Sequence, residues 1–399
     1  MVTGAFHPEI SSGGLQSRLM AVAMRDQADV RVLTTAVVPG APRHSIVDDV
    51  EVTRIHLRSM SIGSKVSATG VMLNEVRRLV SWCDVVHLHG VSSKNILVTA
   101  AARLLGKPIV LSLHTRGQDE PAAVRRQGVA FWWAFTSVSR FLSVSPSLTQ
   151  AYLDAGLPSE RLEQIGNGID TELFSPAPPH EKRRLRSEHG LDPDRPLVLF
   201  VGFFSHDKQP RVLFDAWLRL RDVYRTDAGL IFVGATSSGY HEVDEGLANG
   251  IRAEAARRGL GDRVTFTGAV HDVHDYFRLA DVFVLPSRRE GLPVALLEAM
   301  SCALPSVASR LPGATDTLIE DGVSGRLVPP GDVPAFAEAV HKMLAEPEAA
   351  ARMGAAARTV VMRDFSAATI AARWLANYRI ALGDQASSGP ERPGPPAAG

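Results

Sequence analysis

Two glutamates on either side of a short turn are the strongest sign of a ligand-binding site in this sequence. Glu290 is followed by Gly291-Leu292-Pro293, and seven residues separate it from Glu298. The apolar run Val282–Leu285 predicts a strand before the turn, and a helix is expected to open near Pro293. Backbone N–H groups at a helix start favour an anion, and carboxylates accept hydrogen bonds from vicinal hydroxyls. The block therefore predicts a site for a ligand with anionic and hydroxyl groups, and the plain alternative is a capped helix with a solvated Glu290.

Three histidines lie at or near the ends of predicted strands. His114 closes the run Ile109–His114, and open parallel sheets bind their ligands at the carboxyl ends of strands. An imidazole there can hydrogen-bond a ligand, so we favour a functional role over that of a polar residue satisfied within the fold. His87 and His89 alternate along one strand and face the same side. We expect His87 to be structural, whereas His89 fits either role.

Short apolar, β-branched runs alternate with helix-like segments along the chain. The first series of predicted strands comprises Val30–Thr35, Val50–His56, Val85–His89, Ile109–His114 and Phe141–Val144. The second series comprises Leu197–Gly202, Leu230–Gly234, Val264–Gly268, Val282–Leu285, Ser306–Ala308 and Gly325–Val328. Predicted helices between the strands include Asn95–Leu105, Arg211–Tyr224, Glu245–Arg258, Val273–Leu279 and Val333–Leu344. This alternation is typical of parallel sheets covered by helices on both faces, so we expect two doubly wound α/β domains.

A Pro-rich break marks the expected domain boundary. Phe174-Ser175-Pro176-Ala177-Pro178-Pro179 precedes a charged helix and a new strand. We therefore expect an N-terminal domain over 1–175 and a C-terminal domain over 176–364. A helix within 365–382 is expected to pack back toward the N-terminal domain, and the Gly-, Pro- and Ser-rich tail 383–399 to be disordered. Met1-Val2-Thr3-Gly4 has the character of a strand end, so that strand is short or the natural chain starts upstream.

Composition excludes several classes of protein. Lys plus Arg and Asp plus Glu both number 43 in 399 residues, which argues against a nucleic-acid-binding protein. Cys83 and Cys302 are isolated, so they form no zinc site by themselves, and they suit a reducing cytoplasm. No apolar run approaches the roughly 18–20 residues that span a bilayer. A cytoplasmic location is expected, and peripheral membrane contact stays open because an amphipathic helix gives no such run.

The region around the two glutamates resembles a known family. Ala280-Asp281-Val282-Phe283-Val284-Leu285-Pro286-Ser287, Glu290-Gly291-Leu292-Pro293 and Leu297-Glu298-Ala299-Met300 resemble the donor-binding signature of the family 4 retaining glycosyltransferases. Further resemblances to this family are found at Gly13-Gly14, Gly166-Asn167-Gly168-Ile169-Asp170, Thr267-Gly268-Ala269-Val270 and Pro312-Gly313-Ala314-Thr315-Asp316. The resemblance covers most of the chain. It implies the α/β GT-B architecture, in which two doubly wound, Rossmann-like domains face each other across a cleft.

The resemblance also implies roles for individual residues. The nucleotide-sugar donor would be bound by Gly13, Gly14, Gly202, Lys208, Val270, Glu290, Gly291, Leu292, Pro293 and Glu298. The catalytic residues would be His114 near the transferred sugar, Lys208 beside the departing diphosphate and Glu290 at the sugar hydroxyls. Glu298 would accept hydrogen bonds from the ribose. Members of the family need neither a metal nor a cofactor, since basic side chains and helix starts offset the diphosphate charge; the nucleotide sugar is a substrate.

One position departs from the family pattern. The family places an arginine directly after the glycine of Val201-Gly202, and this chain has Phe203 there, while Lys208 stands where the lysine is expected. His206 and Arg211 are the nearby candidates for the missing charge. The change weakens the expected stabilisation of the leaving group but leaves the donor site. The stretch around Phe203 and the block Gly117-Gln118-Asp119-Glu120-Pro121 resemble members linked to surface polysaccharides.

These features predict a retaining hexosyltransferase. It would move a sugar from a UDP- or GDP-linked donor to a hydroxyl acceptor in glycan, glycolipid or secondary-metabolite biosynthesis. No residue presents itself as the carboxylate nucleophile of a double displacement, which favours substitution on one face of the sugar, with the diphosphate helping to deprotonate the acceptor. A catalytically weakened nucleotide-sugar-binding protein stays open because of Phe203, as does an epimerase or phosphorylase on the same fold. A dinucleotide-dependent oxidoreductase is disfavoured because no Gly-x-Gly-x-x-Gly follows a strand.

No motif identifies the acceptor. Arg116, Arg125, Arg126 and Phe131-Trp132-Trp133 could line a site for an anionic or lipid-linked acceptor. The alternative, which we favour, is surface charge beside core aromatics.

Overall fold

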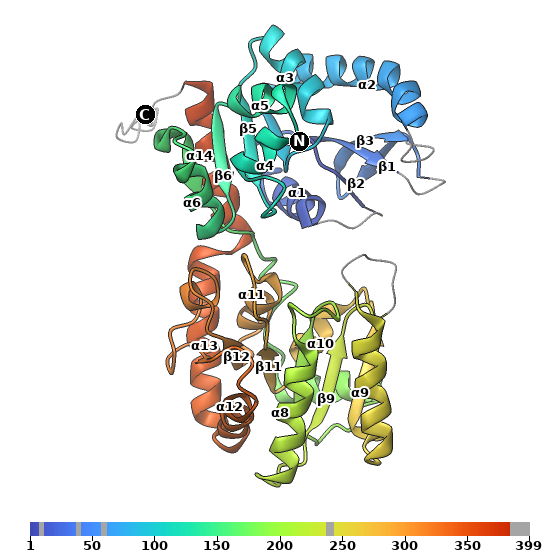
Figure 1. Ribbon diagram of the computed structural model, residues 1–399, viewed down its shortest axis with the longest axis vertical. Helices are drawn as coiled ribbons and strands as arrows, with labels where there is room; N and C mark the ends of the chain where they lie inside the picture. The colour runs from blue at the N-terminus through green and yellow to red at the C-terminus, as the bar shows by residue number, and fades with distance from the viewer. Residues whose placement is uncertain (8–11, 37–40, 57–61, 237–242, 384–399) are drawn as a thin grey trace, which may run out of the picture. The chain divides into compact units, whose positions relative to one another are not determined.

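The computed structural model describes residues 1–7, 12–36, 41–56, 62–236 and 243–383 (Figure 1). Residues 384–399, which make up nearly all of the tail for which disorder was predicted, lie outside the described residues. The chain forms two compact units. The first contains residues 1–143, 151–163 and the chain from 371 onward, and the second contains 144–150 and 164–370. After residue 163 the chain stays in the second unit until it returns to the first at residue 371. The sequence predicts a domain boundary near residue 175.

The strands of the first unit form two groups. β1 (Arg31–Ala36) pairs in parallel with β3 (Val50–His56), which pairs antiparallel with β2 (His44–Val47). β4 (Val86–His89), β5 (Ile109–Leu113), β6 (Arg140–Ser143) and β7 (Leu162–Gln164) follow in that order. Val2 links the groups through parallel bridges to Leu33 and Leu88. Met1–Gly4 therefore contributes only isolated bridges where the sequence suggested the end of a strand.

Helices connect the strands of the first unit. They are α1 (Ser12–Ala23), α2 (Ile62–Trp82), α3 (Lys94–Leu104), α4 (Pro121–Arg126), α5 (Val129–Thr136), α6 (Pro146–Asp154), the 3₁₀ turn η1 (Ser159–Arg161) and α14 (Ala367–Leu382). α6 and α14 each contribute residues to both units. Within the first unit, Arg373 of α14 pairs with Glu163, and Asn377 accepts two hydrogen bonds from Arg140. These contacts fix the last turns of α14 beside β6 and β7.

The second unit contains one six-stranded parallel sheet in the order β10-β9-β8-β11-β12-β13. Its strands are β8 (Leu197–Val201), β9 (Gly229–Val233), β10 (Val264–Gly268), β11 (Val282–Leu285), β12 (Ser306–Ser309) and β13 (Arg326–Val328). The chain winds outward in one direction from β8 and in the other from β11, which is the doubly wound topology. The sheet therefore has its topological switch point between β8 and β11.

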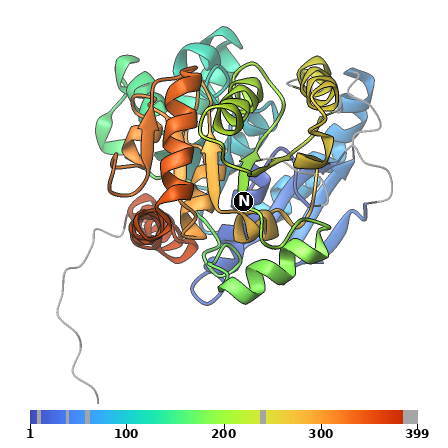
Figure 2. The same ribbon diagram turned by 90° about the horizontal axis from the view of Figure 1, so that it is seen from below.

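Helices cover both faces of this sheet (Figures 1 and 2). One face carries α8 (Pro210–Asp222), α9 (Glu245–Arg257) and α12 (Val333–Ala345), and the other carries α7 (Pro179–Glu188), α10 (Val273–Leu279), α11 (Val294–Ser301) and α13 (Pro347–Asp364). Two 3₁₀ turns, η2 (Gly261–Arg263) and η3 (Thr315–Thr317), complete the unit. Alternate strand residues pack on opposite faces: Phe200 lies in the first core and Leu199 in the second. Burial on both faces is why these strands are continuous apolar runs.

Candidate functional site

Lys208 and Glu290 meet at the switch point of the second unit. The loop after β8 carries Lys208 and the loop after β11 carries Glu290, and these strands are neighbours in the sheet. Lys208 Nζ donates to Glu290 Oε1 at 2.7 Å and to Oε2 at 2.8 Å. The Glu290 side chain is only 7% exposed and that of Lys208 29%. The structure therefore brings these two predicted site residues into direct contact, and their roles stay predictions.

Asp207 joins the same two loops through a second set of contacts. Its carboxylate accepts hydrogen bonds from Arg288 Nε at 2.9 Å and from Arg289 at 2.6 Å, and its carbonyl accepts one from the Arg288 N–H. The Arg288 hydrogen bond is the largest influence that lowers the pKa of Asp207. Asp207 therefore holds two exposed arginines directly before Glu290. Sequence reasoning missed both, although the pair Arg288-Arg289 beside a motif glutamate was a visible signal.

The start of α11 lies directly after this loop. Pro293 precedes the helix, and no side chain caps its first turn. Gly291 is half-buried, with open space where a side chain would begin. Leu292 packs on the core of the second unit and approaches Gly166, whose added Cβ would lie 3.1 Å from it. The uncapped N–H groups thus lie beside a loop anchored at Leu292, which is an arrangement that favours an anion.

Glu298 lies further along α11 and is half-buried. Burial raises the pKa of its carboxyl from 4.5 to about 8. No side-chain hydrogen bond or ion pair to this carboxyl is found in the part of the chain that the structure describes. An ionised carboxyl group that is partly withdrawn from water without a partner is destabilising. Hydroxyl groups of a bound ligand would supply the hydrogen-bond partners that the Glu298 carboxyl lacks among the described residues.

Neither His206 nor Arg211 supplies the positive charge that the family has at position 203. Phe203 is 37% exposed in the same loop as Lys208. His206 faces Asp244 at 3.2 Å, and Arg211 pairs with Asp215 and Glu254. His206 and Arg211 thus contact carboxylates of other segments, whereas Lys208, Arg288 and Arg289 are basic groups within the switch-point loops themselves.

Gly202 and Val270 border the same end of the sheet. Gly202 lies beside Lys208, since an added Cβ would lie 3.9 Å from Lys208 Cδ. It also packs tightly against the next strand, because a Cβ on Gly234 would lie 2.1 Å from the Gly202 carbonyl oxygen. Val270 follows β10 and packs partly buried against the core. Both positions therefore shape the loops at the carboxyl end of the sheet.

In the first unit, His114 belongs to a stack of three histidines. His114 stacks on His89 with ring centroids 5.6 Å apart, and His89 stacks on His87 at 4.3 Å. His87 Nδ1 and Nε2 hydrogen-bond Tyr378 at 2.7 Å and Ser112 at 2.8 Å. These bonds give His87 the structural position expected from the sequence.

The other two histidines of the stack, His89 and His114, have ring nitrogens without a partner among the described residues. Both ring nitrogens of His89 and Nε2 of His114 are buried without a partner among the described residues. Burial lowers the pKa of both rings, so they are uncharged near neutral pH. Asp119 fixes the backbone of His114 by accepting its N–H at 2.7 Å. Neutral imidazoles with unpaired nitrogens are suited to hydrogen-bond a hydroxyl.

Gly13, at the start of α1, lies over these rings. A Cβ added there would lie 3.6 Å from His89 Cβ and 3.9 Å from His114 Cδ2. Gly14 follows in the same helix and is buried. A side chain at Gly13 would occupy the space in front of His89 and His114, so a small residue keeps that space open.

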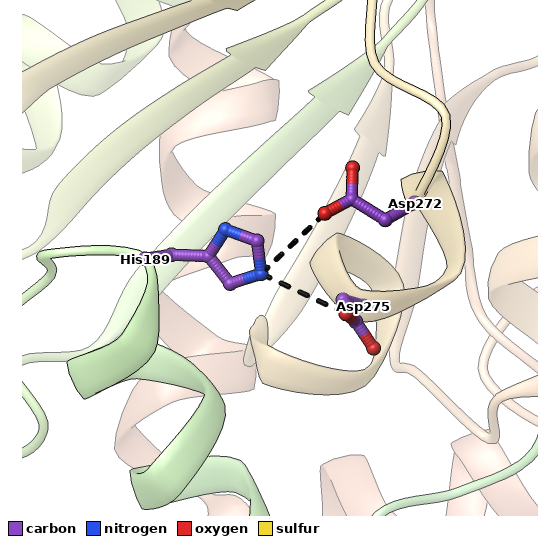
Figure 3. Close-up of side chains that lie close together, drawn as sticks. All are labelled: His189, Asp272 and Asp275. Atoms are coloured by element: carbon purple, nitrogen blue, oxygen red, sulfur yellow. Dashed lines mark ion pairs between the residues drawn. The ribbon is translucent and has the colours of Figure 1, made fainter.

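His189, Asp272 and Asp275 form a separate cluster between α7 and α10 (Figure 3). His189 Nε2 lies 4.0 Å from Asp272 and 3.7 Å from Asp275. Asp272 precedes α10 and Asp275 lies in its first turn, where acidic groups favour the helix dipole. Asp275 also faces Arg278 at 3.6 Å and His274 at 3.7 Å. Ion pairing at a helix start accounts for this cluster, and the absence of a metal requirement stays a prediction.

A cavity of about 530 Å³ in the first unit lies at the opposite ends of the strands from His114. Its walls include Val2, Val30, Arg31, Leu33, Trp82, Val86 and Tyr378. Val30, Arg31 and Val86 lie at or directly before the amino ends of β1 and β4, and Tyr378 comes from α14, whereas ligands of such sheets bind at the carboxyl ends of the strands. His87 also lines this cavity, but none of the predicted donor-binding or catalytic residues does. No helix in the described ranges is long and apolar enough to cross a bilayer.

Comparison with known proteins identifies the family. Residues 181–360 match the family model described as glycosyl transferases group 1, and residues 16–173 match that of glycosyltransferase family 4. The chain is similar to an alpha-maltose-1-phosphate synthase of Mycobacterium tuberculosis, with 32% identity over 79% of this chain and 83% of the relative. It is also similar to a D-inositol 3-phosphate glycosyltransferase of Xylanimonas cellulosilytica, with 30% identity over 74% of this chain and 71% of the relative.

Solved structures show the same fold. Anabaena HepE, crystallised in complex with UDP and glucose, has a TM-score of 0.74 at 20% identity over 94% of this chain and 98% of its own. Sucrose-phosphate synthase from Thermosynechococcus elongatus has a TM-score of 0.73 at 21% identity over 96% and 99%. The chain thus has the two-domain α/β GT-B fold predicted from its sequence, and it belongs to the group 1, family 4 glycosyltransferases and is itself a glycosyltransferase.

Proposed function

We propose that this glycosyltransferase moves a hexosyl group from a UDP- or GDP-linked donor to a hydroxyl acceptor, with retention of configuration and without a metal. The ion pair of Lys208 with Glu290, beside the uncapped start of α11, is the observation that carries the proposal. It combines a cation, a carboxylate and free N–H groups at one switch point. HepE, which shares the fold, binds UDP and glucose, and this supports a nucleotide sugar as the ligand.

The donor diphosphate is proposed to bind at the start of α11. The N–H groups of the first turn and Lys208 offset its charge. Arg289, which directly precedes Glu290, adds a second cation. Glu290 accepts hydrogen bonds from sugar hydroxyls, and Glu298 accepts them from the ribose. Lys208 then has two anionic partners, so it orients Glu290 while it holds the phosphate.

The proposed reaction is a substitution on one face of the sugar. The bond from the anomeric carbon to the diphosphate oxygen breaks, and the acceptor oxygen bonds to that carbon on the same side. The acceptor proton passes to the departing diphosphate oxygen, so a carboxylate nucleophile is not needed. His114, uncharged and with Nε2 unpaired, is proposed to hydrogen-bond the transferred sugar. The protein acts by positioning the substrates and by stabilising the diphosphate.

A thermal-shift screen of UDP-, GDP-, ADP- and dTDP-sugars tests the donor. A ligand that binds only the folded chain raises its melting temperature, so UDP- or GDP-sugars should do so and the others should not. Nuclear magnetic resonance of the product formed with the preferred donor and an acceptor panel then reports the anomeric configuration, and a chelator should leave the rate unchanged. An inverted product, or a rate that disappears with the chelator, would disprove retention or metal independence.

A further inference from the structure

α5 and the end of α4 present an apolar and basic surface that the packing of the first unit does not explain. The helix Val129-Ala130-Phe131-Trp132-Trp133-Ala134-Phe135-Thr136 has one polar residue, at its last position. A helix that is apolar on all sides is normally buried. Here only Ala134 and Phe135 are buried, while Val129 is 87% exposed and Trp133 41%. The sequence favoured core aromatics at this position, and the structure corrects that expectation.

Two arginines border the exposed apolar residues. Arg125 and Arg126 are exposed in the last turn of α4, and two residues separate Arg126 from the start of α5. The Arg125 guanidinium lies 4.2 Å from the centre of the Trp132 ring. An arginine stacked on tryptophan keeps its charge at the surface while its stem covers apolar area. We refer to Arg125, Arg126, Val129, Trp132 and Trp133 as the α4–α5 face.

The stretch of sequence that contains this face has an excess of basic residues. The chain as a whole is neutral, yet the stretch from residue 85 to 153 contains only two acidic residues, Asp119 and Glu120. The same stretch contains seven basic residues, namely Lys94, Arg103, Lys107, Arg116, Arg125, Arg126 and Arg140. Asp119 is buried on backbone N–H groups, and Glu120 pairs with Arg116 at 2.9 Å. Neither carboxylate is available to neutralise Arg125 or Arg126.

The neighbouring helix α3 has the same character. It packs against α5 and ends with Arg103, Leu104 and Leu105. Leu104 is 86% exposed and Leu105 44%, and Lys107 follows. Exposed apolar side chains beside uncompensated cations are typical of surfaces that lie on anionic membranes, where tryptophan occupies the boundary between head groups and acyl chains.

We propose that the α4–α5 face docks this protein on an anionic lipid bilayer, with Val129 and Trp133 in the interfacial region and Arg125 and Arg126 against lipid phosphates. The helix has 8 residues, far fewer than the roughly 20 that cross a bilayer, so the contact is peripheral. Docking by the first unit would bring a lipid-linked acceptor within reach of the enzyme; that consequence alone rests on the proposed function.

Vesicle flotation of the full chain tests docking. The wild type should float with phosphatidylcholine vesicles that contain phosphatidylglycerol and stay unbound with phosphatidylcholine alone. Each arginine near an anionic surface strengthens partitioning about fivefold, so Arg125→Glu/Arg126→Glu should weaken it by more than about tenfold. Trp133→Ser should also weaken it and should reduce the quenching of tryptophan emission by brominated lipid, with the remainder coming from Trp132.

The matched control is Arg257→Glu/Arg352→Glu, which makes the same change in net charge at exposed arginines of the second unit. It should bind vesicles like the wild type. Equal binding by the Arg125→Glu/Arg126→Glu variant and this control would overturn the proposal, as would a concentration-dependent dimer in sedimentation velocity that Trp133→Ser abolishes. Calorimetry with UDP in the absence of vesicles reports the donor site separately, so a failure of membrane docking is distinguishable from a failure of the proposed function.

Discussion

Replacing Glu298 with glutamine should make the protein more stable and its donor site weaker. Glu298 is half-buried in α11, and burial raises the pKa of its carboxyl from 4.5 to about 8. Near neutral pH the unfolded chain ionises this group freely, whereas the folded chain holds its proton. Glutamine has a similar shape and cannot ionise, so Glu298→Gln removes this difference between the two states.

The sign and size follow from the two pKa values. A raised carboxyl pKa contributes stability that is fully present below pH 4.5 and is lost as the pH rises to about 8. One pH unit between the two values corresponds to about 1.4 kcal/mol, which gives a full loss of about 4–5 kcal/mol. Relaxation around the charged group reduces this figure, so we expect the advantage of Glu298→Gln over the wild type to grow by about 2–5 kcal/mol between pH 5 and pH 9.

Urea unfolding at pH 5, 7 and 9, followed by circular dichroism, measures this advantage. Glu338→Gln is the control, because Glu338 is exposed and its hydrogen bond to Lys342 lowers its pKa. That variant should show a small change of opposite sign. An advantage of Glu298→Gln that is the same at all three pH values would contradict a raised pKa of the Glu298 carboxyl, since it would show that Glu298 is solvated or already paired.

The remaining predictions concern the two loops, the histidine stack and the packing of α11. Lys208→Ala should lower turnover about 10²–10³-fold with little effect on acceptor KM, whereas Lys342→Ala, which breaks an exposed Lys–Glu pair, should leave steady-state rates unchanged. Arg288→Gln/Arg289→Gln should weaken UDP binding about tenfold and uridine binding hardly at all in calorimetry; equal losses for both ligands would exclude a role at the diphosphate. His114→Ala should lower turnover and leave UDP affinity intact, and a changed affinity with normal turnover would reject its proposed role at the sugar. Gly354→Ala should cost about 1–3 kcal/mol in urea unfolding, because the added Cβ would lie 2.1 Å from the Ala303 carbonyl oxygen after α11, whereas Gly250→Ala, in open space on α9, should be neutral or slightly stabilising.

Much of the fold was predictable because most strands are buried on both faces. Predicted strands at 50–56, 264–268 and 282–285 and the helix at 273–279 match the structure residue for residue. Several elements were missed, and three of them show why. The edge strand β2 is partly exposed and has a weak apolar pattern, α13 buries mainly small residues such as Ala350, Gly354 and Ala357, and the short α5 reads as buried core although much of it is exposed.

The site was predictable only in part. Types and spacing predicted roles for Glu290 and Glu298, and the family resemblance predicted one for Lys208. The contact between Lys208 and Glu290 joins residues 82 positions apart and follows from the order of the strands. The arginines on Asp207 were missed because their role depends on that long-range contact. The stacking of His89 on His114 likewise depends on the pairing of β4 with β5.

A crystal structure with UDP or GDP bound would show whether the loops at the switch point hold the donor. We expect the diphosphate at the first turn of α11, with an oxygen about 3 Å from Lys208 Nζ, and the ribose hydroxyls within hydrogen-bond distance of Glu298. Nucleotide bound at another edge of the sheet, or with its diphosphate turned away from Lys208 and α11, would rule out this donor site.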